Sequence, residues 1–374
     1  MKKVKVLVVL SQIRKALEHE WFVDFMDRSK FDFEFILLNG RDSPMSDFLE
    51  SRAVPVYHYT FRSNADLIPI MFKMVVLMRR NKYDIVHTHL IEACLTGLLA
   101  AKIAGIRRRI MTRHHSDLHH TWHPHAVKYD KFVNYLATDI VAISSVVQNI
   151  LIAWEGVQAH KVHLIPHGIN VSIFDNDVNL QNRIEDLKRK YNLQQSGKVI
   201  GVISRFTEWK GVQFIIPAFR ELLIQYPDSV ILFANATGDY RDALMKQCKT
   251  IPERNIRFIE FENDIPALYG LFDYFVHVPI SQESEAFGQI YIEALAARVP
   301  SVFTRSGIAC DFAEDKCNCL LVPYKNSETI LNGLITFLKD KALCFKLQEA
   351  GYETVAGNYT IQLKAARLEE LYLK

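Results

Sequence analysis

Buried-strand patterns alternate with helical stretches along the whole chain, and this alternation is the strongest constraint on its fold. Continuous apolar runs such as Lys3–Leu10 and Lys198–Ile203 are typical of parallel strands covered on both faces. Stretches with helical spacing, such as Asp66–Arg80 and Val212–Gln225, lie between the runs. The sequence therefore predicts an α/β protein with doubly wound parallel sheets.

The alternation pauses at Pro166-His167-Gly168 and then starts again. We therefore expect two Rossmann-like domains that face each other across a cleft, the first over residues 1–168 and the second over residues 169–355. A last helical segment within residues 356–374 is expected to return to the first domain. Ligands of such sheets bind outside the carboxyl ends of the strands, so the cleft is the expected site.

Composition narrows the class of protein. Among the 374 residues, 49% are apolar and 23% are charged, as in a soluble globular protein. The net charge of +3 indicates no strong field for nucleic acid, so no nucleic-acid partner is expected. The six cysteines show no Cys-x-x-Cys spacing, which favours reduced thiols in a cytoplasmic protein.

Two carboxylates, Glu285 and Glu293, lie eight residues apart around Gly288. A helix that begins at Gly288 would point its free N–H groups and positive dipole end at an anion. The two carboxylates could then hold the two ends of a nucleotide-sugar. An ordinary surface helix with two solvated glutamates explains the spacing equally well, so spacing alone leaves both interpretations open.

A second polar segment follows the apolar run Lys198–Ile203. Arg205 and Lys210 lie five residues apart in this loop, before the helical stretch that begins near Val212. Arginine offers a fork of donors and lysine a point charge, and together they suit a diphosphate. Judged alone, such a segment is more often a solvated loop with routine charges, and this alternative stays open.

The segments together resemble a known family. Arg205, Lys210 and Gly211, followed by Glu285 and Glu293, resemble the motif of the retaining nucleotide-sugar glycosyltransferases of family 4, called glycosyl transferases group 1. Three further segments resemble that family in the same order, and the match extends over nearly the whole chain: 161–170, 255–261 and 293–300. The resemblance implies the GT-B fold.

The resemblance also implies roles for single residues. It assigns the donor diphosphate to Arg205 and Lys210, with backbone N–H groups of Phe287, Gly288 and Gln289. Glu293 would bind the ribose, Glu285 would face the donor sugar, and the base would lie near Phe258–Phe261. The implied catalytic residues are Glu285, His114, Arg205 and Lys210. The implied donor-binding residues are Arg205, Lys210, Phe261, Phe287, Gly288, Gln289 and Glu293.

His114 enters this set because Thr112-Arg113-His114-His115 resembles the loop that carries the family's active-site histidine. His115 is its neighbour and the alternative for that role. Six histidines crowd into residues 114–125 beside Asp117 and Trp122. We expect a lid or acceptor-binding loop here, and a zinc site or an unspecialised loop remain as alternatives.

The expected function is that of a metal-independent, retaining glycosyltransferase. It would move a sugar from a UDP- or GDP-activated donor to a glycan, polysaccharide or lipid-linked acceptor. No metal or other cofactor is expected, because Arg205 and Lys210 would neutralise the phosphates. The alternatives are a sugar-nucleotide epimerase or hydrolase on the same scaffold, or a non-catalytic nucleotide-sugar-binding protein.

Basic residues in the first half of the chain suggest contact with a membrane. Arg107, Arg108 and Arg109, with the apolar stretch Asp66–Arg80, could dock on anionic lipid. A core helix with a solvated basic surface is the alternative. We expect a cytoplasmic protein that contacts the inner face of the membrane peripherally, if at all.

The chain departs from the family pattern at several turns. No glycine occurs in Ser11–Lys15, where the family often has a Gly-Gly loop after the first strand. Arg298 and Cys319 each replace a usual glycine, and Cys310-Asp311 replaces a usual Pro-Glu pair. These positions lie in turns and leave the carboxylates and cations in place, which suggests a distinct subgroup.

Overall fold

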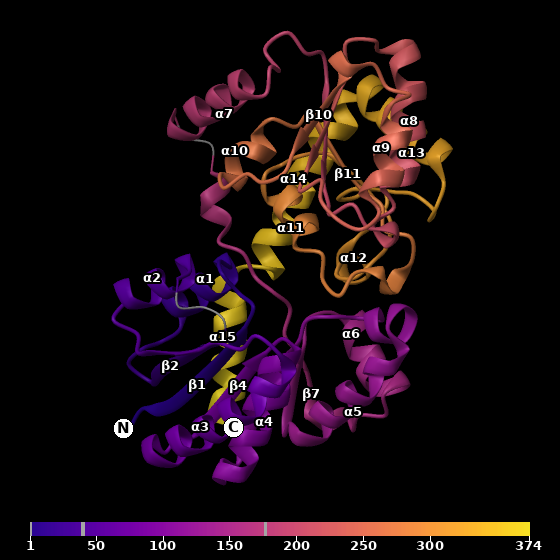
Figure 1. Ribbon diagram of the computed structural model, residues 1–374. Coiled ribbons are helices and arrows are strands. Elements are labelled where there is room, and N and C mark those ends of the chain that lie inside the picture. Colours follow the sequence, from indigo (N-terminus) through magenta and orange to yellow (C-terminus); the bar gives the residue numbers. More distant parts are fainter. Residues whose placement is uncertain (1, 39–41, 176–177) are drawn as a thin grey trace. The chain divides into compact units, whose positions relative to one another are not determined.

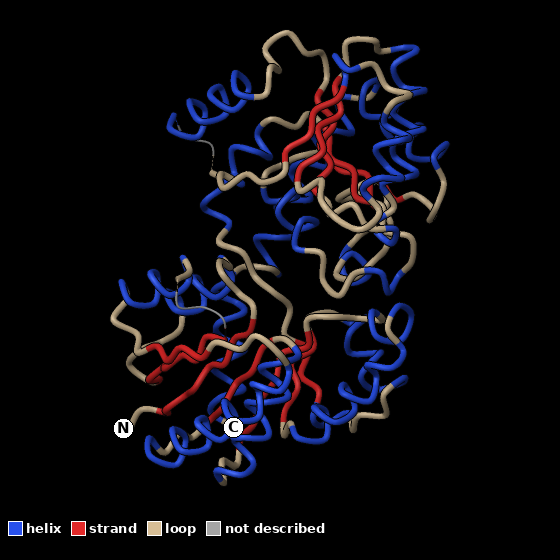
Figure 2. Tube along the Cα trace, in the orientation of Figure 1, coloured by secondary structure: helices blue, strands red, loops and turns tan. Residues whose placement is uncertain are grey.

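The computed structural model describes residues 2–38, 42–175 and 178–374, and its contacts divide the chain into two compact units. The N-terminal unit comprises Met1–Ile169 with Ile361–Lys374, and the C-terminal unit comprises Asn170–Thr360. Each unit contains one parallel sheet with helices packed on it (Figures 1 and 2). The expected fold class, two Rossmann-like α/β domains, is therefore confirmed.

The N-terminal sheet has seven strands in the order β3-β2-β1-β4-β5-β6-β7, and all neighbours run parallel. Val6 to Leu10 in the central strand are almost fully buried because helices cover both faces of the sheet. This explains the unbroken apolar run in the sequence. The strands are β1 (Val4–Ser11), β2 (Phe31–Leu38), β3 (Val56–Tyr59), β4 (Ile85–His89), β5 (Arg108–Arg113), β6 (Asp139–Ala142) and β7 (Val162–Leu164).

The helices of this unit include one from the far end of the chain. Helix α15 (Ile361–Leu373) packs against α1 (Leu17–Phe25) and contributes Leu368 and Tyr372 to the same hydrophobic core as β1 and β2 (Figure 1). Helices α3 and α4 pack side by side, and α5 packs on α4. The other helices are α2 (Pro44–Ser51), α3 (Leu67–Asn81), α4 (Ile91–Ala104), α5 (Val127–Leu136) and α6 (Ser145–Asn149).

The C-terminal sheet has six parallel strands in the order β10-β9-β8-β11-β12-β13. Its strands are β8 (Val199–Ile203), β9 (Val230–Ala234), β10 (Ile256–Ile259), β11 (Tyr274–His277), β12 (Ser301–Phe303) and β13 (Leu320–Leu321). Its helices are α7 (Val178–Lys190), α8 (Val212–Gln225), α9 (Arg241–Cys248), α10 (Ile265–Gly270), α11 (Gln289–Ala296), α12 (Ala309–Phe312), α13 (Ser327–Lys339) and α14 (Lys341–Asn358). No helix within the described ranges is both long enough and apolar enough to cross a membrane.

Three local differences from the sequence pattern have physical causes. Helix α1 was not predicted because it buries His19 along with Trp21, so its inner face does not show a plain apolar repeat. The sequence pattern over Ser145–Glu155 predicts a single helix, whereas the structure has α6 over Ser145–Asn149 and a π-helical turn over Ile150–Trp154. Helix α14 does not end at Gly351 but continues to Asn358. The glycine has a packing role instead, because Leu295 lies where a side chain at position 351 would be.

Buried histidines distinguish the N-terminal core. His87 on β4 is 1% exposed, and its ring nitrogens lie 2.6 Å from the Tyr372 hydroxyl and 2.8 Å from the Thr112 hydroxyl. His19 on α1 lies edge-on to the ring of His89. Burial lowers the pKa of His87 to about 3 and that of His19 to about 4, so both imidazoles are neutral in the folded unit.

These two histidines should make the stability of the N-terminal unit depend on pH. Between pH 6.5 and about 4 the unfolded chain binds protons that the folded chain excludes, so stability falls as the pH falls, by ~1.4 kcal/mol per pH unit for each site. We expect His87→Asn to reduce this slope by about one proton. Urea unfolding at several pH values, followed by circular dichroism, measures it.

The slope is the quantity to compare, since His87→Asn also removes packing and lowers stability at every pH. His160→Gln serves as the control, because His160 is exposed. An unchanged slope in His87→Asn would show that His87 is already protonated in the folded unit.

Candidate functional site

The site residues of the C-terminal unit follow strands on both sides of the point where the strand order reverses. Strand β8 leads outward to β9 and β10, whereas β11, its other neighbour, leads outward to β12 and β13. Ligands of open α/β sheets bind at such a switch point, outside the carboxyl ends of the strands. Arg205 and Lys210 follow β8, and Glu285 follows β11.

Glu285 is the centre of this group. Its carboxylate Oε1 accepts a hydrogen bond from the Lys210 ammonium and lies 2.9 Å from His277 Nε2. Its backbone N–H donates to Ser306 Oγ at 3.1 Å. Burial by itself would raise the pKa of Glu285, but Lys210 and His277 outweigh it and lower the pKa to about 2. Glu285 is therefore an ionised carboxylate held from two sides.

Sequence reasoning missed His277. It is the last residue of β11, is buried, and packs edge-on against the ring of Tyr291. Burial lowers its pKa, so it acts as a neutral partner that orients Glu285. The one signal in the sequence was a histidine that ends an otherwise apolar strand, at the edge where such sheets bind ligands.

A glycine brings the two loops together. Gly211 follows Lys210 with φ of +75°, and a Cβ built on it would lie 1.9 Å from the carbonyl oxygen of Val278. Only glycine allows this approach, because both the conformation and the space exclude a side chain. The loop after β8 is thereby packed on the loop after β11, and Ile280 N–H donates to Trp209 O at 3.0 Å.

Helix α11 carries the second carboxylate. Gly288, with φ of +79°, precedes the helix, whose first residue is Gln289, as the sequence predicted. The Glu293 carboxylate accepts hydrogen bonds from Gln289 Nε2 at 2.8 Å and from the Tyr269 hydroxyl at 3.1 Å. Burial raises its pKa. Tyr269 was not singled out from the sequence.

The remaining donor-side candidates differ in exposure. Arg205 is exposed, and the structure gives its guanidinium no ion-pair partner among the described residues. Phe261, just beyond β10, is 71% exposed, whereas Phe258 stacks on Phe233 within the unit. Phe287 is buried immediately before α11. The structure thus joins Lys210 to Glu285 directly and leaves Arg205 and Phe261 free to meet a ligand.

The N-terminal unit has a cavity of about 320 Å³ at the carboxyl ends of its own central strands. Gln12 follows β1 with φ of +54°, the left-handed region that favours glycine, and its amide donates to Glu92 Oε1 at 2.7 Å. The missing glycine after β1 is therefore replaced by a glutamine in a glycine-like conformation. The cavity is lined by Gln12, Leu90, Ile91, Glu92, Cys94, Met111, Thr112, Arg113, His114, His115, Leu118, His119 and Val133.

His114 lies in this cavity wall, next to a second polar cluster. His114 Nε2 lies 2.9 Å from His89 Nδ1, and its ring stacks on His167. His167 Nδ1 in turn lies 2.8 Å from Glu18 and 3.2 Å from the Lys364 ammonium, which α15 supplies. Burial lowers the pKa of His114 well below its usual range, so the ring is neutral.

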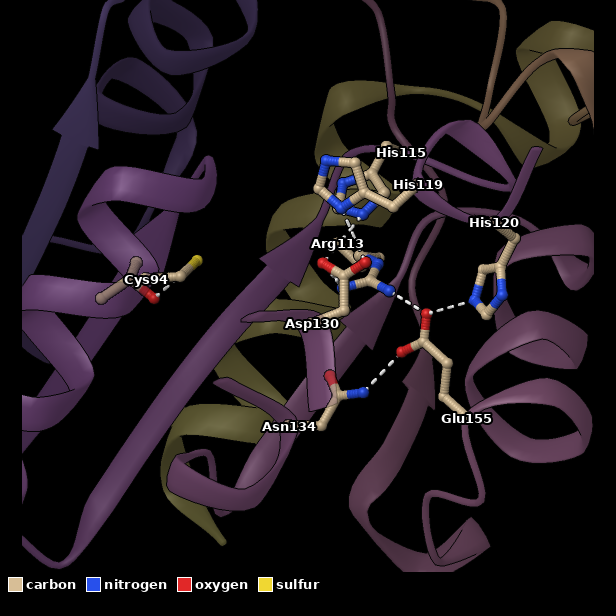
Figure 3. A network of polar contacts seen from close by, with 9 residues as sticks. Cys94, Arg113, His115, His119, His120, Asp130, Asn134 and Glu155 are labelled. Carbon is tan, nitrogen blue, oxygen red and sulfur yellow. Dashed lines mark hydrogen bonds and ion pairs between the residues drawn. The ribbon is translucent and has the colours of Figure 1, made fainter. Parts of the chain in front are cut away.

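Three further histidines of the segment, His115, His119 and His120, belong to another polar network (Figure 3). Asp130 on α5 accepts hydrogen bonds from Arg113 Nη1 at 2.9 Å, His115 Nε2 at 3.1 Å and His119 Nδ1 at 2.7 Å. Arg113 also pairs with Glu155, which His120 approaches from another side. Two of the histidines counted from the sequence therefore bind one buried carboxylate.

Comparisons with known proteins identify the family of the chain. The model of the glycosyl transferases group 1 matches residues 183–354, and the model of Glycosyltransferase Family 4 matches residues 22–173. A galactosyltransferase of Escherichia coli that acts on α-D-GlcNAc-diphosphoundecaprenol is 22% identical over 99% of this chain and 95% of its own. The capsular polysaccharide glycosyltransferase CapM of Staphylococcus aureus is 22% identical over 94% and 92%.

Solved structures agree on the architecture. The Anabaena protein HepE in complex with UDP and glucose superposes with a TM-score of 0.84 and 20% identity, over 98% of this chain and 99% of that chain. A glycosyltransferase from Rickettsia africae superposes with a TM-score of 0.81 and 20% identity, over 100% and 98%. The chain therefore belongs to the family 4, group 1 glycosyltransferases and has their GT-B fold.

Proposed function

We propose that this glycosyltransferase moves a hexose from a nucleoside-diphosphate-sugar to a glycan, polysaccharide or lipid-linked acceptor, with retention of configuration and without a metal. One observation carries the proposal: Lys210 and Glu285, from loops on either side of the switch point of the C-terminal sheet, contact each other directly. The cation that would stabilise the leaving group and the ionised carboxylate that would face the sugar are therefore in direct contact. Names of relatives support the substrate classes, since they include an undecaprenol-linked galactosyltransferase and a capsular polysaccharide enzyme.

The chemistry follows from the charges that develop during transfer. The departing diphosphate gains negative charge while the anomeric carbon gains positive charge. Lys210 and the exposed Arg205 would stabilise the diphosphate, together with the backbone N–H groups of Phe287, Gly288 and Gln289 at the start of α11. Two cations and a helix end would do the work that Mg²⁺ does at many phosphate sites, so the proposal needs no metal.

Glu285 and His114 would act on the sugar. The low pKa of Glu285 keeps its carboxylate ionised at neutral pH, so it can stabilise positive charge on the donor sugar. His114 would contact the same sugar as a neutral hydrogen-bonding group. Glu293 would accept hydrogen bonds from the ribose, and the exposed Phe261 would lie beside the base. UDP-sugars are the first donors to test, because the HepE complexes contain UDP and UDP-glucose.

The first prediction concerns turnover. We expect Glu285→Gln, Lys210→Ala and Arg205→Ala each to lower kcat at least ~100-fold, because each removes charge from a preorganised site. Release of nucleoside diphosphate from a panel of donors and acceptors, without added Mg²⁺ or Mn²⁺, measures it, and NMR of the product gives the anomeric configuration. Arg189→Ala is the control, since Arg189 lies on α7 with its side chain 66% exposed.

These assays also separate the rival functions. An epimerase or hydrolase would consume the donor without an acceptor, and a non-catalytic binder would release no nucleoside diphosphate with any acceptor. Full transfer activity in all three variants would defeat the assignment of the site.

A second prediction concerns donor binding. We expect Glu293→Gln to weaken donor binding about 10–100-fold, because a hydrogen bond to a charged group contributes about 1.5–3 kcal/mol. The measurement is the thermal stabilisation of the chain by a series of UDP- and GDP-sugars, which reports binding to the folded state. Glu349→Gln, at an exposed ion pair with Arg298, should leave the stabilisation unchanged. Equal stabilisation of Glu293→Gln and the parent chain would remove Glu293 from the donor site.

The proposal extends to the location of the protein: cytoplasmic, with peripheral contact to the inner face of an anionic membrane. Helix α3 exposes Ile68, Phe72 and Val76, which recur every four residues along one side, and it contains no acidic residue. Helix α5, which packs on α4 beside it, exposes three aromatic side chains, Tyr129, Phe132 and Tyr135. Exposed cations lie on these helices or shortly after them in the chain: Lys73, Arg79, Arg80, Lys82, Lys102, Arg107, Lys128 and Lys131.

Exposed apolar side chains and cations on the same helices suit a membrane surface with anionic lipid headgroups. We expect Lys73→Glu/Arg79→Glu/Arg80→Glu to lower partitioning onto phosphatidylglycerol vesicles at least ~100-fold, because each cation contributes about 1 kcal/mol. Cosedimentation with these vesicles and with neutral phosphatidylcholine vesicles measures it. Ile224→Ser, at an exposed apolar position of α8, is the control. If the parent chain does not cosediment with the anionic vesicles, the proposed membrane contact is refuted.

A further inference from the structure

The polar network around Asp130 has a geometry that a transition-metal ion could use. His115 Nε2, His119 Nδ1 and a carboxylate oxygen of Asp130 lie within 4.8 Å of one another. Each nitrogen is 2.7 or 3.1 Å from its carboxylate oxygen. Two ligands of a tetrahedral zinc ion are about 3.3 Å apart, given metal–ligand distances of ~2.0–2.2 Å. To admit the ion, the distance from Asp130 to His119 would have to grow by about 0.6 Å and that to His115 by about 0.2 Å.

The charges of the network favour a cation. The side chains of Asp130 and Glu155 are fully buried, and the same guanidinium, that of Arg113, pairs with both of them. One guanidinium serves both buried carboxylates, and their other partners are the rings of His115, His119 and His120 and the Asn134 amide instead of a second arginine or lysine. A divalent ion at Asp130 would supply positive charge, with Arg113 still holding the other oxygen of that carboxylate as an outer partner.

In a second histidine–carboxylate cluster, an ammonium group already lies beside the atoms that could bind a metal ion. Glu18, His114 and His167 also bring three ligand atoms together. There the Lys364 ammonium contacts both Glu18 and His167, so a cation already occupies the position. At Asp130 the neighbouring cation is the Arg113 guanidinium, which contacts the carboxylate and not the two histidines, and His115 and His119 are among the residues that line the 320 Å³ cavity.

We propose that His115, His119 and Asp130 form a binding site for one Zn²⁺ ion, with a fourth coordination position open to the cavity of the N-terminal unit. Two imidazoles and a carboxylate are ligands that zinc prefers, and an open fourth position is typical of sites that bind a water or a substrate group. The ion would also tie the π-helical turn Leu118–Trp122, which carries His119, to helix α5, which carries Asp130.

This inference is independent of the donor chemistry proposed above, because its ligands all belong to the N-terminal unit and its test needs no donor. Zinc would not replace Arg205 or Lys210 at the diphosphate. It would instead present a positive, exchangeable position to an oxygen atom of whatever enters the cavity.

The test is zinc binding by the full chain after treatment with a chelator and removal of the chelator. We expect one Zn²⁺ per chain, measured by competition with a chromogenic chelator, and an increase in Tm on addition of Zn²⁺. The variant His115→Gln/His119→Gln removes both ring ligands but keeps amide N–H groups that can donate to Asp130. We expect it to lose at least ~100-fold in affinity, since loss of an outer partner alone typically costs about 10–100-fold.

The matched control is His123→Gln/His125→Gln, which removes two exposed histidines from the same segment and should leave zinc affinity unchanged. Circular dichroism without zinc shows whether the variants fold. Replacement by Co²⁺ adds a spectroscopic test, because its absorption bands report a tetrahedral site with nitrogen ligands.

Three results would overturn the proposal. They are an absence of stoichiometric Zn²⁺ binding by the parent chain, equal affinity in His115→Gln/His119→Gln and the parent, or a loss of affinity in the control that matches the loss in the double variant. The last result would describe loose binding by a histidine-rich surface instead of a defined site.

Discussion

Parallel strand pairing is the constraint on which the rest of this protein depends. Because every strand in a sheet points the same way, all the loops at the carboxyl ends lie along one edge. In the C-terminal unit this brings Lys210 and Glu285, from loops after adjacent strands, into direct contact although they are 75 residues apart in sequence. In the N-terminal unit the same rule places Gln12, Glu92 and His114 around one cavity.

A second theme is the compensation of buried charge. Glu285 is held by Lys210 and His277, and Glu18 by His167 and Lys364. The pair of Glu285 and Lys210 suits a reaction in which charge separates, because its groups already have the signs that the leaving group and the sugar require. Asp130 and Glu155 share one guanidinium, that of Arg113, and this sharing is what distinguishes their network from the other two.

Much of the fold could be predicted from the sequence, because buried parallel strands appear as continuous apolar runs. The misses occur where polar groups are buried or small residues pack closely. Helix α1 buries His19 on its inner face, and Leu295 packs closely against Gly351 in the middle of α14. At two positions where the family usually has glycine, Gln12 and Arg298 have φ of +54° and +55°. The backbone there adopts the left-handed conformation that favours glycine, although the residue type is different.

The sequence by itself determined the class of fold, the position of Glu285 and Glu293 around the start of a helix, and the placement of Arg205 and Lys210 after a buried strand, because these depend on local periodicity and short spacing. Only the tertiary structure decided that His277 and Tyr269 orient the two carboxylates, that Lys364 returns from the far end of the chain to Glu18, and that His115 and His119 bind Asp130. These partners are distant in sequence and meet only when helices and strands pack, so no local pattern records them.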